Sequence, residues 1–254
     1  MDDLLTAGRL CMSPAGAHLT SADTDLGELF YLSSTTGFPI RGGIPIIAPA
    51  FADLLPNQPR HGFARTSDWR VTTDGRGFSA TLVNEGLHFD LAVQELSEGV
   101  RLSLSLSVRN ESGSPRTVQL GFHPYFRVGH VEKVSVHGLE GVDAVDRVSA
   151  AASAQEGAVT VTGPYDRIFR ASRTAVIDDP ELGRRITVTA EGADSTVVWN
   201  PGAEAAASMA DVGAGEWADF LCVEPALLGA DLQGIELADG ASRELAMTVT
   251  VEKL

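Results

Sequence analysis

Strict alternation of apolar and polar residues is the feature that most limits the folds open to this chain. Apolar residues hold every second position from 87 to 93 and again from 102 to 108, with His, Asp, Ala or Ser between them. A period of two residues over this length is typical of β-strands with one buried face. Similar patterns predict further strands at 79–84, 184–191 and 245–251.

Clusters of Gly with Asp, Asn, Glu or Ser separate these runs and favour hairpin turns. They lie at 74–75, 84–86, 110–113 and 239–240, and at Ser97-Glu98-Gly99. No stretch predicts a long amphipathic helix, and the best short candidates are 51–55 and 204–209. Consecutive short hairpins favour antiparallel sheets over a βαβ arrangement. We therefore predict an all-β fold, a large antiparallel β-sandwich.

The chain shows no sign of division into separate domains. It has 254 residues, a length that a single large sandwich can use in full, and it contains no repeat, charged tail or Pro/Gly/Ser linker. Residues 149–157 are rich in Ala and Ser and predict a surface loop or a helix turn rather than a domain boundary. The prediction is one domain over residues 1–254.

Composition narrows the possible partners and the compartment. The net charge is -15, from 19 basic and 34 acidic residues, so the long-range field repels nucleic acids and anionic membranes. The first residues are acidic and no apolar run approaches the roughly 18 residues of a membrane span, which predicts a cytoplasmic protein. Cys11 and Cys222 lack any metal-ligand spacing, so neither a zinc site nor a disulfide framework is expected.

Four segments interrupt the strand pattern with polar residues held between Gly and Pro. They are Pro39-Ile40-Arg41-Gly42-Gly43-Ile44-Pro45, His61-Gly62-Phe63-Ala64-Arg65, Gly121-Phe122-His123-Pro124-Tyr125-Phe126 and Cys222-Val223-Glu224-Pro225. His123 and Glu224 each follow a short apolar run and precede a proline, which predicts that each lies in extended backbone where its strand ends. A carboxylate after such a run is expensive to bury without a partner or a task, whereas a histidine beside aromatic residues is as often a packed core residue.

These segments resemble the galactose mutarotase-like superfamily, the aldose 1-epimerases, and within it the D-hexose-6-phosphate (glucose-6-phosphate) 1-epimerases. Six motifs of the chain match that pattern in order between about residues 38 and 226. They are Arg-Gly-Gly-Ile-Pro at 41–45, His-Gly-Phe-Ala-Arg at 61–65, the histidine segment at 123–126, Asp166-Arg167, Trp199-Asn200-Pro201 and the glutamate segment at 222–225. The resemblance implies a β-supersandwich that interconverts the α and β anomers of a hexose without a cofactor or metal.

The resemblance also implies roles for individual residues. Glu224 would be the general base at the C1 hydroxyl and His123 the general acid at the ring oxygen. His61 would hydrogen-bond the sugar, Asp166 would accept from a sugar hydroxyl, and Trp199 would form a wall of the site. Two alternatives stay open: Asp166 as a turn residue after Gly163-Pro164, and Trp199 as a core residue.

Charge along the chain bears on the substrate. Residues 38–70 contain four Arg and two Asp, a net charge of +2, so the rest of the chain carries -17. We predict that Arg41 and Arg65 in this segment hold a sugar phosphate; the alternative is internal pairing, for instance with Asp53 or Asp68. The residue after His123 is Pro124, as in free-sugar members of the superfamily. The hexose-6-phosphate branch often has threonine at this position.

The sequence therefore leaves three candidate functions. The leading one is an epimerase of a hexose 6-phosphate, followed by a mutarotase of free glucose or galactose and by a carbohydrate-binding protein without catalysis. A glycoside hydrolase is disfavoured because hydrolysis normally needs two carboxylates across the bond. The expected partner is a small hexose or hexose phosphate, with the chain a monomer or a weak homodimer.

Overall fold

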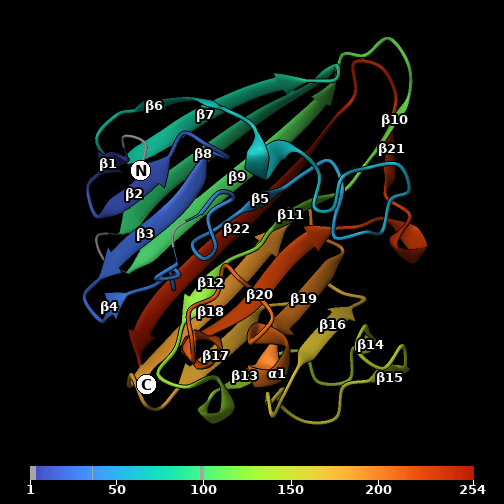
Figure 1. The fold of residues 1–254 in the computed structure, drawn as a ribbon. Helices are drawn as coiled ribbons and strands as arrows, with labels where there is room; N and C mark the ends of the chain where they lie inside the picture. The colour runs from blue at the N-terminus through green and yellow to red at the C-terminus, as the bar shows by residue number, and fades with distance from the viewer. Residues whose placement is uncertain (1–3, 36, 98–99) are drawn as a thin grey trace.

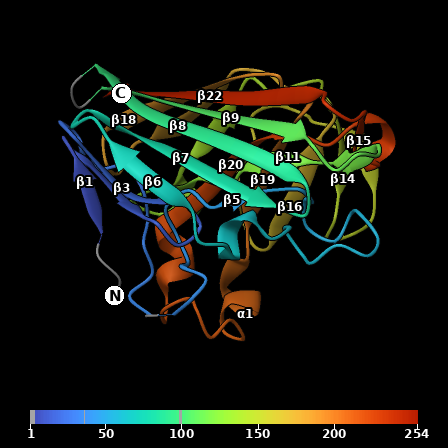
Figure 2. The same ribbon diagram turned by 90° about the horizontal axis from the view of Figure 1, so that it is seen from above.

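Two large antiparallel sheets dominate the computed structural model, which describes residues 4–35, 37–97 and 100–254. The two sheets form separate layers when seen from above (Figure 2). The predicted turn at Ser97-Glu98-Gly99 includes two residues, Glu98 and Gly99, that lie outside the described part of the chain.

The first sheet, called the back sheet below, contains the long alternating strands expected from the sequence. Along β8, Leu87, Phe89, Leu91 and Val93 are buried while the residues between them are not, which confirms the period-two prediction. In the described residues the order of its strands is β13 (Ser135–His137), β17 (Ala175–Asp179), β18 (Arg184–Glu191), β22 (Ser242–Lys253), β9 (Arg101–Asn110), β8 (Leu87–Ser97), β7 (Gly77–Asn84) and β6 (Arg70–Thr73).

The second sheet, called the site sheet below, is built from shorter strands and lies in front of the first in Figure 1. Within the described ranges its order is β15 (Ala152–Ala154), β14 (Asp143–Asp146), β16 (Tyr165–Phe169), β19 (Ser195–Asn200), β20 (Phe220–Leu227), β11 (Leu120–Phe122) and β5 (Ile46–Ile47), and β12 (Tyr125–Arg127) also pairs with β20.

Smaller elements complete the described structure. One further sheet is formed by β1 (Leu5–Ala7), β2 (Leu10–Ser13), β3 (His18–Thr24) and β4 (Gly27–Glu28), and another by β10 (Arg116–Val118) and β21 (Ile235–Leu237). The helical pieces are short: α1 (Gly202–Ala206) and the 3-10 turns η1 (Ala64–Thr66), η2 (Val131–Lys133), η3 (Glu216–Asp219) and η4 (Ala230–Leu232). The predicted all-β antiparallel sandwich is confirmed.

The main apolar core lies between the two large sheets and decides which face of the site sheet is free. Leu221 and Val223 of β20 belong to the same buried cluster as Phe89 and Leu106 of the back sheet. Because side chains alternate along a strand, the even-numbered residues of β20 point to the other face. That outward face, the side from which α1 projects in Figure 2, is where the polar motifs gather.

The predicted effect of proline on β20 was wrong, and the correction locates the site. β20 runs through Pro225 to Leu227, so Glu224 lies within a strand and not at its end. The strand that pairs with β20 is the one that is interrupted: β11 ends at Phe122 and β12 begins at Tyr125, with His123-Pro124 between them. Gly121 pairs with Ala226 and Tyr125 with Cys222, which is one unbroken register, so His123 lies directly opposite Glu224.

Three smaller predictions also need correction. Residues 51–55 form a turn, closed by the Leu54 N–H on the Phe51 carbonyl oxygen, because Ala52 has φ +48°, outside the right-handed helical region. The expected surface loop at 149–157 contains the edge strand β15, whose residues are all exposed and therefore show no alternation. The expected helix at 204–209 begins earlier, as α1.

No helix in the described chain is long and apolar enough to cross a bilayer.

One buried histidine of β3 makes the stability of the fold depend on pH. His18 is buried, and its Nε2 lies 2.7 Å from the Gly42 carbonyl oxygen. This hydrogen bond ties β3 to the 41–45 segment. Burial, opposed by the Gly42 hydrogen bond and assisted by the nearby Arg65 charge, lowers the pKa of His18 to about 4. Between about pH 6.5 and pH 4 the unfolded chain therefore binds a proton that the folded chain refuses.

We expect this histidine to lower the free energy of unfolding as the pH falls from about 6.5 to about 4, by about 1.4 kcal/mol per pH unit. Denaturant unfolding of the wild type and of His18→Gln, measured across this window, should show a shallower pH slope for the variant. His88→Gln, at a half-buried position on β8, is the control and should keep the wild-type slope. Equal slopes in all three proteins would contradict the assignment.

Candidate active site

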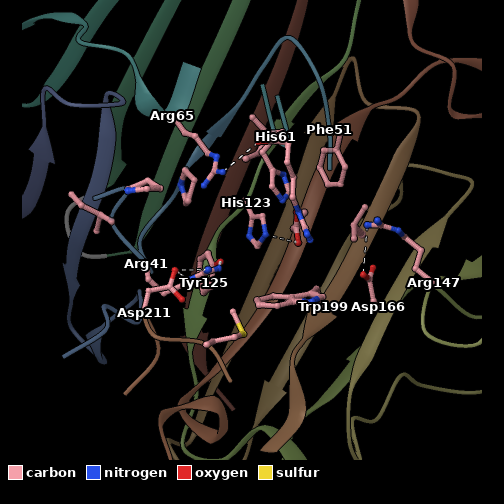
Figure 3. A pocket seen from close by; sticks show the side chains of 18 residues that line it. Arg41, Phe51, His61, Arg65, His123, Tyr125, Arg147, Asp166, Trp199 and Asp211 are labelled. Carbon is pink, nitrogen blue, oxygen red and sulfur yellow. Dashed lines mark hydrogen bonds and ion pairs between the residues drawn. The ribbon is translucent and has the colours of Figure 1, made fainter. Parts of the chain in front are cut away.

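A cavity of about 310 Å³ opens on the outward face of the site sheet (Figure 3). It brings together every residue that the sequence analysis proposed for the site: Arg41, His61, Arg65, His123, Asp166, Trp199 and Glu224. Further lining residues come from the segments 39–60 and 209–211 and from Tyr125, Arg147 and Val197. Residues as distant in sequence as Pro39 and Glu224 thus meet around one space.

Strand register explains why these side chains converge. Neighbouring strands place directly opposed residues on the same face of a sheet. Across β16, β19, β20 and the β11–β12 chain, two such rows cross the outward face. One row is Ile168, Val197, Glu224 and His123, and the next is Asp166, Trp199, Cys222 and Tyr125.

His123 and Glu224 form the buried centre of the cavity. Their side chains are 10% and 1% exposed, and His123 Nε2 lies 3.4 Å from Glu224 Oε1. Burial, with the nearby Asp166 charge, raises the pKa of Glu224 well above its usual range, while burial and the neighbouring His61 lower the pKa of His123. Glu224 Oε2 and His123 Nδ1 have no hydrogen-bond partner among the described residues. The pair therefore presents two buried polar atoms that a ligand could satisfy.

His61 faces the pair from the opposite wall. Its ring meets that of His123 edge-on, with centroids 5.7 Å apart, and its Nδ1 accepts the Ala52 amide at 3.3 Å. An Nδ1 that accepts leaves the proton of the neutral ring on Nε2, so His61 is set as a hydrogen-bond donor. Burial and the surrounding arginines, Arg65 first, lower its pKa to about 3, which keeps the ring neutral.

Asp166 lies on strand β16, so the alternative of a turn residue was wrong. Its carboxylate is 3.5 Å from Nη1 of Arg147, whose Nη2 contacts Asp53 at 2.8 Å. Burial raises the pKa of Asp166 and the Arg147 charge opposes that rise. Sequence analysis missed Arg147 because it follows β14 without any motif; only the pairing of β14 with β16 brings it to the cavity.

Arg41 is paired inside the protein, but with neither of the aspartates considered from the sequence. Its Nε and Nη2 donate to Asp211 Oδ2 at 2.9 and 2.6 Å, and its Nη1 donates to the Tyr125 hydroxyl at 2.7 Å. Asp211 and Tyr125 therefore join the site, and neither was proposed from the sequence. Arg41 is a fixed, largely neutralised part of the wall.

Among the cavity arginines of the described structure, Arg60 and Arg65 have no ion pair, and Arg65 is the one of these two that is not exposed. No carboxylate of the described residues lies within ion-pair distance of Arg65, and its side chain donates one hydrogen bond to them, from Nη2 to the Arg60 carbonyl oxygen at 3.3 Å. Its Nε is buried without a partner, and burial together with the Arg41 charge lowers its pKa. An anion in the cavity would relieve this unbalanced charge.

Aromatic residues form the floor beside the acid–base pair. The Tyr125 ring stacks on His123 with centroids 4.8 Å apart, and Trp199 meets both rings edge-on at 5.7 and 6.0 Å. Trp199 is half-buried and lines the cavity, so it packs on the floor and also faces the open space. Such a mixed floor suits a pyranose ring, whose faces are apolar and whose edge is polar.

A polar cavity with an aromatic floor on the face of an all-β sandwich is suited to a small polar ring compound, and sequence comparison identifies the family. A model of the aldose 1-epimerase family matches residues 7–250. The chain belongs to that family, and the family defines it as an isomerase acting on a small sugar.

Individual relatives agree. A protein of Cenchrus ciliaris named "Putative glucose-6-phosphate 1-epimerase" is 33% identical over 83% of this chain and 72% of its own length. An Escherichia coli K12 protein with the same name is 32% identical over 83% of this chain and 77% of its own. The solved structure of a "putative mutarotase" from Salmonella typhimurium superposes with a TM-score of 0.83 and 26% identity, covering 100% of this chain and 92% of the other. These relatives support interconversion of hexose anomers as the reaction of the family.

The backbone that carries His61 allows a test of how the cavity wall is held. Gly62 has φ +67°, and a Cβ there would lie 2.0 Å from the Ala48 carbonyl oxygen. We expect Gly62→Ala to lower the free energy of unfolding by more than the roughly 1–2 kcal/mol that a left-handed alanine costs by itself. Gly75→Ala is the matched control, because Gly75 has φ +89° with open space around it. Chemical denaturation of both variants would measure the difference, and equal losses would show that the Ala48 contact is not restrictive.

Proposed function

We propose that this protein interconverts the α and β anomers of a hexose 6-phosphate, with Glu224 and His123 as its acid–base pair and Arg65 as the main contact for the phosphate. The observation that carries the proposal is the buried contact of His123 with Glu224 at 3.4 Å, on the floor of a cavity that also holds an uncompensated arginine. The names of the relatives in Cenchrus ciliaris and Escherichia coli support the phosphorylated substrate.

Anomer exchange needs only proton transfers. One group removes the proton of the C1 hydroxyl while another protonates the ring oxygen; the ring opens, the C1 group rotates, and closure on the other face reverses both transfers. Each group must therefore both give and take a proton. In this proposal Glu224 acts first as the base at the C1 hydroxyl and His123 as the acid at the ring oxygen.

The shifted pKa values of Glu224 and His123 indicate which of the two groups carries the shared proton before substrate binds. In the empty cavity burial favours the neutral form of both groups, which places one proton on Glu224 and leaves His123 neutral. The catalytic state has the same number of protons, with one moved from the carboxyl to the imidazole. Sugar hydroxyls that donate to the Glu224 oxygens stabilise the carboxylate and so promote this shift when substrate binds.

Neighbouring side chains fit the remaining tasks. His61, as a neutral donor, would bind the sugar oxygen that becomes the carbonyl oxygen of the open chain, and Asp166 would accept from a ring hydroxyl. Arg147 would keep Asp166 ionised through its 3.5 Å contact. Trp199 and Tyr125 would support the apolar face of the ring.

Arg65 is a better phosphate contact than Arg41. Arg41 already gives three hydrogen bonds to Asp211 and Tyr125, whereas Arg65 has an unsatisfied Nε and no ion pair in the described structure. A free aldose such as glucose remains the second candidate substrate, favoured by Pro124 at the position after the catalytic histidine.

We expect Glu224→Gln to reduce anomer exchange by about 10²–10⁴-fold, because an amide cannot take up the hydroxyl proton. The rate would be measured by NMR exchange on α-glucose 6-phosphate and on α-glucose, with spontaneous exchange subtracted. Glu140→Gln removes an exposed carboxyl far from the cavity and is the control that should keep full activity. A Glu224→Gln enzyme with near wild-type rate would rule out this residue as the base.

We expect Arg65→Gln to raise the KM for glucose 6-phosphate by about tenfold or more and the KM for glucose by much less, since a lost charge-assisted hydrogen bond to phosphate is worth about 1.5–3 kcal/mol. Arg70→Gln, an exposed arginine outside the cavity, is the matched control and should change neither value. Equal increases for the two sugars would argue against phosphate binding at Arg65.

A further inference from the structure

Beside the acid–base pair lies a buried thiol that the proposed reaction does not use. Cys222 is fully buried on β20, two residues before Glu224 and on the same face of the sheet, between Tyr125 and Trp199 in the strand register. It is not among the residues that line the cavity. A ring nitrogen of His123, the Sγ of Cys222 and a carboxylate oxygen of Glu224 all lie within 4.8 Å of one another.

This trio offers three of the four ligands of a tetrahedral zinc site. Zn²⁺ takes imidazole nitrogen, thiolate and carboxylate at about 2.0–2.3 Å, so ligand atoms in a tetrahedral site are about 3.5 Å apart. The contact between His123 and Glu224 already has that spacing, at 3.4 Å. The Sγ of Cys222 lies within 4.8 Å of both other ligand atoms, so it has to come closer by at most about 1.3 Å, a χ1 rotation of roughly 30–40° away from its rotamer.

A second observation points to a ligand at the same place. Glu224 Oε2 is buried and unpartnered in the described structure, on a carboxyl that is 1% exposed and lines the cavity. Three protein ligands with a fourth position open to a cavity are the arrangement of zinc sites that keep one exchangeable water. The rings of Tyr125 and Phe220 belong to the same buried cluster as Cys222, with Trp199 packed against it, so the thiol has apolar surroundings.

We propose that His123, Cys222 and Glu224 form a binding site for a soft divalent cation such as Zn²⁺, and that the bound ion inhibits the enzyme by occupying both members of the acid–base pair. Binding displaces the protons of the thiol and of the carboxyl into solvent and adds a cavity water as fourth ligand. The inhibitory part rests on the proposed function, whereas the binding part rests only on the geometry of the three side chains.

The expected affinity is moderate and reversible. Metal-bound histidines normally donate their second ring N–H to a carboxylate or carbonyl, and losing such a partner costs about 10–100-fold in affinity. His123 Nδ1 has no partner among the described residues. The site is therefore expected to release its ion to a chelator, unlike a structural zinc site.

Binding is tested directly with CoCl₂, whose thiolate complex has a charge-transfer band in the near ultraviolet. The wild type and Cys11→Ser should show the band at one cobalt per chain, and Cys222→Ser should show none. Cys11 is the matched control because it is the other cysteine of the chain and lies on β2, away from the cavity. The absence of the band in the wild type would overturn the proposal, whatever the enzyme does with sugars.

Inhibition is tested with ZnCl₂ in a chelator-free buffer, by NMR exchange on α-glucose 6-phosphate. Wild type and Cys11→Ser should be inhibited and should recover with EDTA. Cys222→Ser should keep its basal rate and need at least about tenfold more zinc for the same inhibition, the effect of one lost ligand. Equal zinc sensitivity of the Cys222 and Cys11 variants would contradict inhibition through this site.

The two proposals fail in distinguishable ways. A cobalt band in a protein that accelerates no anomer exchange would keep the metal site and reject the acid–base roles. An active enzyme without the band would do the reverse. Should Cys222→Ser fold poorly by circular dichroism, Cys222→Ala provides the same loss of ligand, and the wild-type cobalt titration still decides whether the site exists.

Discussion

The antiparallel register between β20 and the β11–β12 chain is the constraint on which the rest of the site depends. One unbroken register places His123 opposite Glu224 and Tyr125 opposite Cys222, although the ladder between β11 and β12 is interrupted at Pro124. Alternation along the strands then directs Leu221 and Val223 into the core and Glu224 to the cavity. A shift by one residue would exchange these faces and remove the site.

The arginines around the cavity differ in whether they are paired with carboxylates, and this difference separates their roles. Arg41 and Arg147 hold aspartates at 2.6–3.5 Å and thereby build the wall, while Arg65 keeps an unsatisfied nitrogen. The overall charge of -15 opposes extended anions. A small anion that reaches Arg65 meets a local field of the opposite sign, so the acidic composition and a phosphorylated substrate are compatible.

Much of the fold could be predicted because strand formation depends on the pattern of residues that are close together in sequence. Alternation at Leu87, Phe89 and Leu91 specifies a strand with one buried face wherever it lies in the molecule. The failures are equally instructive. Residues 51–55 were expected to be helical, yet Ala52 has φ +48°, where a right-handed helix cannot continue. Pro225 reads as a strand end, yet its strand continues to Leu227.

The sequence by itself determined the all-β architecture, the chemical identity of the polar residues and, through six ordered motifs, the family. Tertiary structure decided which of those residues share a cavity and which charges remain available. Arg41 is neutralised by Asp211, 170 residues away, and Asp166 is held by Arg147, which no motif marks. Likewise Cys222 meets His123 only through strand pairing. The reason is physical: hydrophobic period is a property of neighbouring residues, whereas ion pairing and ligand geometry depend on side chains brought together from distant strands.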